Sequence, residues 1–96
     1  MILRRRRLRR PRITVYSRAG CHLCEQAEAD VRRLARSRAE IEVVDIDTDP
    51  RLAERYTLRV PVVAIDGHEV AELQVDPAAV RAALRSALRA PQRAAM

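Results

Sequence analysis

Two cysteines, three positions apart, are the residues of this chain best suited by type and spacing to do chemistry. Cys21 and Cys24 follow a short β-type run, Ile13–Tyr16, and lead directly into a strong helix-forming segment. At the first turn of a helix, Cys21 would lie against unpaired backbone N–H groups and the positive end of the helix dipole, which favours thiolate over thiol. Cys24 would lie one turn on, close enough to attack a mixed disulfide formed at Cys21. The spacing therefore predicts a site for dithiol–disulfide exchange.

A zinc site and a structural pair are the alternatives for these two cysteines. Zinc prefers four Cys or His ligands, and the chain has no second C-x-x-C and no His pair. Its two histidines are far apart, because His22 lies between the cysteines and His68 lies in a predicted hairpin. We favour the redox interpretation because the pair begins a helix, and we predict no metal ligands.

Two charged or titratable neighbours could assist the cysteines. As an imidazolium beside Cys21, His22 would stabilise the thiolate; the alternative is an exposed polar side chain at the mouth of the site. Arg18 could bind an anionic thiol substrate, whereas a single arginine in a loop can also be only a solvated charge. Both residues are therefore candidate substrate-binding residues.

The length and cysteine count predict the broad class of protein. Ninety-six residues allow one small domain, and two cysteines in one motif cannot form the disulfide framework of a small secreted protein. No secretory signal follows the first residues, and no apolar run approaches the roughly 18 residues of a membrane span. We therefore expect a cytoplasmic protein that acts as a monomer.

The net charge of +6 is concentrated at the start of the chain. Residues 1–12 contain seven arginines and no acid, so the remaining 84 residues carry 12 arginines against 13 acidic residues, a net charge near −1. We expect residues 1–12 to form a disordered basic tail and residues 90–96 a frayed C-terminus. The tail is either a solvated extension or an arm for nucleic acid or an anionic surface, in which case the chain could be a non-catalytic binding module.

The rest of the chain predicts the elements that hold the cysteine pair. Turn and cap signals separate apolar segments, with Asp49-Pro50 and Asp76-Pro77 opening helices and Asp66-Gly67 marking a hairpin. The expected strands are 13–16, 41–46, 60–65 and 68–73; the expected helices are 23–37, a short one after Pro50 and a last one between Pro77 and Pro91. The order β-α-β-α-β-β-α predicts an α/β domain over residues 13–89, with a four-stranded mixed sheet flanked by three helices.

Together, Cys21-His-Leu-Cys24, Arg59-Val60-Pro61-Val62 and Asp66-Gly67 make the chain resemble the thioredoxin fold, and most closely the glutaredoxin-like proteins. The resemblance implies that Cys21 is the nucleophile and Cys24 the resolving thiol. It also implies a cis Val60–Pro61 bond facing the cysteines, with the N–H and C=O of Val60 pairing with a bound peptide. Arg18 stands where glutaredoxins commonly place a basic residue that contacts glutathione.

The chain departs from glutaredoxins at two places. His22-Leu23 replaces the usual Pro-Tyr between the cysteines, and residues 71–76 lack the Gly-Gly that helps to hold glutathione. The resemblance still implies a thiol–disulfide oxidoreductase that reduces protein or low-molecular-weight disulfides. It would need no bound cofactor, and its reductant would be glutathione, an equivalent thiol or thioredoxin reductase.

Overall fold

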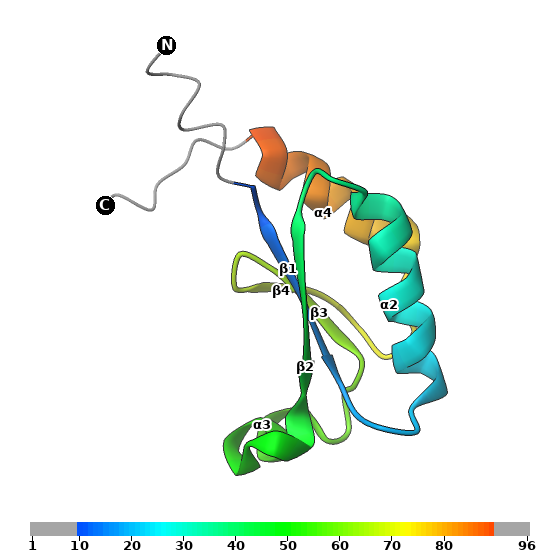
Figure 1. Ribbon diagram of the computed structural model, residues 1–96, viewed down its shortest axis with the longest axis vertical. Coiled ribbons are helices and arrows are strands. Elements are labelled where there is room, and N and C mark those ends of the chain that lie inside the picture. The colour runs from blue at the N-terminus through cyan, green and yellow to red at the C-terminus, as the bar shows by residue number, and fades with distance from the viewer. Residues whose placement is uncertain (1–9, 90–96) are drawn as a thin grey trace, which may run out of the picture.

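Residues 10–89 are the part of the chain that the computed structural model describes, and they form one sheet with its helices (Figure 1). The predicted order of strands and helices is confirmed, with a single 3₁₀ turn in addition. In chain order, the elements are β1 (Arg12–Ser17), α2 (His22–Ala35), β2 (Glu40–Asp45), η1 (Ile46–Thr48), α3 (Pro50–Tyr56), β3 (Val62–Ile65), β4 (His68–Glu72) and α4 (Pro77–Arg89).

The strand order across the sheet is β2-β1-β3-β4. Strands β1 and β2 run parallel because α2 carries the chain back between them, and the β3–β4 hairpin then adds antiparallel to β1. Tyr16 near the end of β1 is in register with Val62 at the start of β3. The chain leaving β1 and the chain entering β3 therefore lie at the same end of the sheet.

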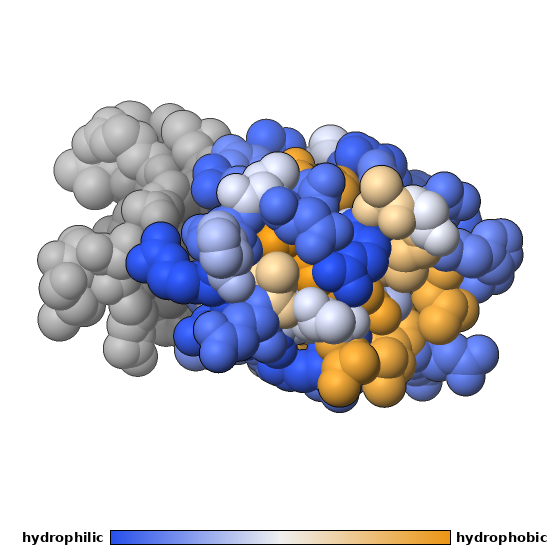
Figure 2. Space-filling model, turned by 90° about the horizontal axis from the view of Figure 1, so that it is seen from below, coloured by the Kyte–Doolittle hydropathy of each residue, from blue (hydrophilic) through white to orange (hydrophobic). Residues whose placement is uncertain are grey.

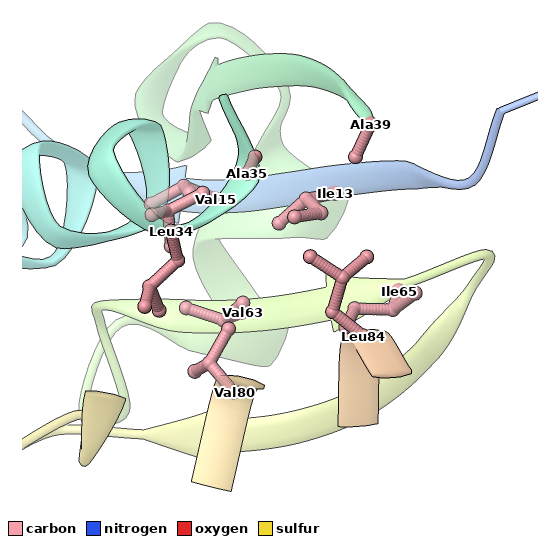
Figure 3. Close-up of a cluster of buried hydrophobic side chains, with 10 residues drawn as sticks. Ile13, Val15, Leu34, Ala35, Ala39, Val63, Ile65, Val80 and Leu84 are labelled. Carbon is pink, nitrogen blue, oxygen red and sulfur yellow. The ribbon is translucent and has the colours of Figure 1, made fainter. Parts of the chain in front are cut away.

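The alternation of side chains along the strands builds a hydrophobic cluster on each face of the sheet. On one face, Ile13 and Val15 of β1 pack with residues of β3, α2 and α4. Figure 3 shows Val80 and Leu84 of α4 pointing toward this layer. On the other face, Tyr56 of α3 packs with residues that include Ile46 and Val62. The sheet is therefore covered by α2 and α4 on one side and by the short α3 on the other.

Backbone conformation explains where two of the predicted elements end. Asp66 and Gly67 both have positive φ, 50° and 86°, which is the conformation of a tight two-residue hairpin turn. The Asp66 carboxylate also accepts a hydrogen bond from the backbone N–H of Arg12 at 2.9 Å, which ties the turn to β1. Helix α2 ends at Ala35, two residues before the predicted boundary, because Arg36 has a φ of 51°.

The start of the described chain is bonded to the domain. Strand β1 begins at Arg12, one residue before the predicted boundary, and Arg10 donates a hydrogen bond to the carbonyl of Ser37 at 2.9 Å. Residues 10–12, the last three of the predicted disordered tail, therefore belong to the fold. Residues 1–9 and 90–96 lie outside the described part of the chain, so the rest of the predicted tail and the predicted frayed C-terminus stay predictions. Among residues 10–89, none of the helices has the length and apolar character that a bilayer span requires.

Candidate functional site

Cys21 and Cys24 are joined by a disulfide at the first turn of α2, with their Cα atoms 5.2 Å apart. Cys21 is the N-cap residue of the helix, and its Sγ accepts a hydrogen bond from the backbone N–H of Cys24 at 3.1 Å. The tight turn before it uses Gly20 at a φ of 76°. The first sulfur therefore lies where helix N–H groups can stabilise a thiolate after reduction.

The two sulfurs differ in their access to solvent. Cys24 is 1% exposed and belongs to the buried side of α2, whereas Cys21 is half-buried at the helix start. A substrate can reach the first cysteine, and only a group already bonded there can be reached by the second. This asymmetry fits attack by Cys21 and resolution by Cys24.

The Val60–Pro61 peptide bond is cis and lies at the same end of the sheet as the disulfide. One detail implied by the resemblance is different: the backbone N–H of Val60 already donates to the carbonyl of Tyr56 at 3.1 Å. The Val60 carbonyl accepts no hydrogen bond within residues 10–89, so it is the group of this residue left for a docked peptide.

A charged cluster holds this cis-proline segment against β4. Arg59 donates to Glu72 at 2.8 and 3.0 Å and also to Glu69, and its guanidinium lies 5.3 Å from the centre of the Tyr56 ring. The hydrogen bond from Arg59 lowers the pKa of the Glu69 carboxyl. The backbone N–H of Leu73 then donates to the carbonyl of Pro61 at 2.8 Å. Arg59 is therefore a candidate residue for positioning the cis-proline segment, a role that the sequence did not indicate.

Arg18 lies in the loop before Cys21, and its guanidinium is occupied. It donates two hydrogen bonds to the Asp47 carboxylate, at 2.7 and 3.0 Å. This pairing raises the pKa of Arg18 and lowers the pKa of Asp47. The pair joins the cysteine loop to η1, 29 positions further along the chain. A contact between Arg18 and substrate stays a prediction, and the Arg18 guanidinium already has a carboxylate partner in Asp47.

The Arg18–Asp47 pair predicts a pH-dependent contribution to stability. Since the folded-state pKa of Asp47 lies below its ordinary value of 3.8, this contribution is present above that value and is lost as the pH falls through the folded-state pKa. Asp47→Asn should therefore lower the melting temperature at neutral pH, and the difference from wild type should close in strong acid. Glu54→Gln, at an exposed position of α3, is the control. Its difference in melting temperature from wild type should not close between neutral pH and strong acid. A difference that is the same at both pH values would contradict the prediction.

His22 is the first residue of α2, and it is exposed. Within residues 10–89 its ring makes no hydrogen bond to either cysteine, so its predicted effect on the Cys21 thiolate stays a prediction. Beside it, Leu23 opens a groove of about 360 Å³ between α2 and the segment after β4. The groove is lined by Leu23, Gln26, Ala27, Asp30, Leu73, Gln74, Val75 and Asp76.

Exposed apolar side chains surround the disulfide end of the molecule. Figure 2 looks onto this end and shows hydrophobic residues lying among hydrophilic ones. Leu23, Leu58 and Leu73 are 36%, 87% and 45% exposed. Leu73 also has a φ of 63°, a left-handed conformation that favours glycine over leucine. No local sequence pattern indicates this conformation, because it depends on the hydrogen bonds that the Leu73 N–H donates to the carbonyls of Arg59 and Pro61.

Comparisons with known proteins agree with this geometry. Residues 12–85 match the model of the glutaredoxin-like domain (DUF836). The uncharacterized protein Rv0508 of Mycobacterium tuberculosis is 31% identical over 80 residues, which are 76% of this chain and 81% of that protein.

Two solved structures show the same fold. The XcR50 protein of X. campestris is 37% identical, with a TM-score of 0.65 over 77% of this chain and 96% of that one. A thioredoxin mutant from Halobacterium salinarum is 25% identical, with a TM-score of 0.64 over 85% of this chain and 78% of that one. The predicted α/β thioredoxin-like fold is confirmed.

Proposed function

The chain belongs to the glutaredoxin-like domain family (DUF836), and we propose that it is a dithiol–disulfide oxidoreductase that reduces disulfides in proteins. The thioredoxin fold with a cysteine pair at disulfide distance supports a redox function in general. The observation that carries the specific proposal is the position of Cys21, whose sulfur caps α2 and accepts the N–H of the buried Cys24.

The reaction has two exchange steps. In the first, the Cys21 thiolate attacks one sulfur of the substrate disulfide, which forms a mixed disulfide and releases the other substrate sulfur as a thiolate. In the second, Cys24 loses its proton and attacks the Cys21 sulfur, which forms the intramolecular disulfide and releases the second substrate thiolate. Two electrons pass from the dithiol to the substrate, and no bound cofactor is needed.

A two-electron reductant must then restore the dithiol. We propose that this is glutathione, an equivalent low-molecular-weight thiol, or thioredoxin reductase, in a cytoplasm that keeps thiols reduced. We further propose that the protein acts as a monomer. Because α2 presents Cys21 at the same end of the sheet as its own cis-proline segment, a single copy carries all the groups that the exchange needs.

The surroundings of Cys21 favour a protein substrate over a small anionic disulfide. The Arg18 guanidinium, which would attract a carboxylate, is paired with Asp47. The Val60 carbonyl can accept one backbone hydrogen bond from an extended peptide, and Leu23 and Leu73 can contact apolar side chains that flank the substrate cysteine. These contacts suit a segment of protein chain.

The test is a coupled assay on the full chain with a protein disulfide as substrate. Reduction should proceed with at least one of two reductant systems, glutathione with its reductase or thioredoxin reductase. The same assay on a small anionic disulfide should give a lower kcat/KM. If neither system supports turnover although Cys21 and Cys24 cycle between the oxidised and reduced forms, the enzyme assignment is wrong.

Leu73→Gly tests the apolar contact to the substrate. Glycine fits the φ of 63° without strain, so the variant removes the side chain and keeps the backbone. Because Leu73 is 45% exposed, burying the exposed part of its side chain against the substrate should contribute roughly 1 kcal/mol to binding. Losing the side chain should therefore raise the KM for a protein disulfide about fivefold. The KM for a small disulfide should not change. Leu88→Ala, a similarly exposed leucine on α4, is the control; an equal rise there would contradict the assignment.

A further inference from the structure

The end of the molecule opposite the disulfide gathers positive charge. The C-terminal ends of α2 and α4, the turn into β2 and the start of β1 lie together at this end, while the loop before α2 and helix α3 lie at the other (Figure 1). Arg10, the first described residue, donates a hydrogen bond to the carbonyl of Ser37 at this end.

Four arginines of this end have no carboxylate partner within residues 10–89. The other arginines here are paired: Arg10 and Arg12 with Glu40, Arg32 with Glu28, and Arg33 with Asp30. The four without a carboxylate, which we name the basic end, are exposed, and they are Arg36, Arg38, Arg85 and Arg89.

The positions of the apolar and aromatic residues favour a lipid surface over nucleic acid as the anionic partner. Leu88 lies on α4 between Arg85 and Arg89 and is 40% exposed. The chain has two tyrosines and no Trp or Phe, and both tyrosines, Tyr16 and Tyr56, stack on each other at the other end of the sheet. The basic end therefore has an exposed leucine that can enter a lipid interface and no aromatic ring on which a base can stack.

We propose that the basic end binds a membrane surface that carries anionic phospholipids. Arginine forks pair with headgroup phosphates, and the attraction adds up over several arginines. Since the disulfide lies at the opposite end of the molecule, the bound protein would keep Cys21 directed toward its substrates. The proposal concerns location and does not depend on the redox assignment.

The test measures partition of the full chain onto lipid vesicles by sedimentation. Vesicles with about one third phosphatidylglycerol should bind the protein, vesicles of phosphatidylcholine alone should not, and added salt should release it. The variant Arg85→Gln/Arg89→Gln should lower the partition coefficient by roughly fivefold per arginine, about 25-fold in all.

The matched control is Arg51→Gln/Arg55→Gln, which makes the same change in net charge on exposed residues of α3. It should lower the partition coefficient less than twofold, and equal melting temperatures would show that both variants fold. Three results would overturn the proposal: equal binding to both kinds of vesicle, an equal loss in the control, or release of the protein by a double-stranded oligonucleotide at matched phosphate concentration. The last result would identify nucleic acid as the partner.

Discussion

Replacing Cys21 with serine is expected to lower kcat/KM for a protein disulfide by at least about a thousandfold. The serine hydroxyl is not ionised near neutral pH and cannot form a disulfide, so the first exchange step has no nucleophile. The remaining cysteine is 1% exposed and cannot take over the attack. The measurement is turnover in the coupled assay, with the variant's melting temperature as a check on its fold.

Cys24→Ser is the matched control, because it makes the same change at the other sulfur. This variant keeps the attacking thiolate and lacks the resolving thiol, so it should accumulate a mixed disulfide with the substrate. Mass spectrometry without reductant should find the substrate bonded to Cys21. If Cys21→Ser traps the substrate and Cys24→Ser does not, the roles of the two cysteines are the reverse of those proposed.

Leu84→Ala is expected to give the largest loss of stability among single changes on α4. Leu84 is fully buried and points into the layer between α4 and the sheet (Figure 3). Truncating such a leucine removes its burial and leaves a cavity, which lowers the free energy of unfolding by about 2–5 kcal/mol. Urea unfolding followed by far-ultraviolet circular dichroism measures the change.

The control for this change is one turn further along the same helix. Leu88→Ala makes the identical substitution at a side chain that is 40% exposed, and its cost should stay below about 1 kcal/mol. Both variants keep alanine's high helix propensity, so the difference between them measures packing alone. Equal losses would show that α4 is not held on the sheet through Leu84.

Much of the fold could be predicted from sequence because its signals are local. The apolar spacing of α2, the alternation in the strands and the Asp66-Gly67 turn each depend on neighbours a few positions away. The cysteine pair could be assigned to a helix start for the same reason. The resemblance added the cis bond at Pro61, which no local pattern in the chain indicates.

The features that could not be predicted from the sequence are contacts between segments far apart along the chain. Nothing near Arg18 shows that its partner is Asp47, and nothing near Arg59 shows that it bonds to Glu69 on the neighbouring strand. These pairs exist only because the sheet brings its strands together. The left-handed backbone of Leu73 has the same origin, since its N–H is drawn to the carbonyl of Pro61. Sequence patterns describe which face a residue takes, and they do not specify its partner across the fold.

The stacked tyrosines give the protein a spectroscopic signal that reports on one face of the sheet. Tyr16 and Tyr56 lie with ring centres 4.4 Å apart, and they are the only aromatic residues of the chain. Its aromatic near-ultraviolet signal therefore comes from the α3 side of the sheet, whereas most helical signal comes from α2 and α4 on the other side. Monitoring both bands during unfolding would follow the two faces separately, and coincident curves would mean that they melt as one cooperative unit.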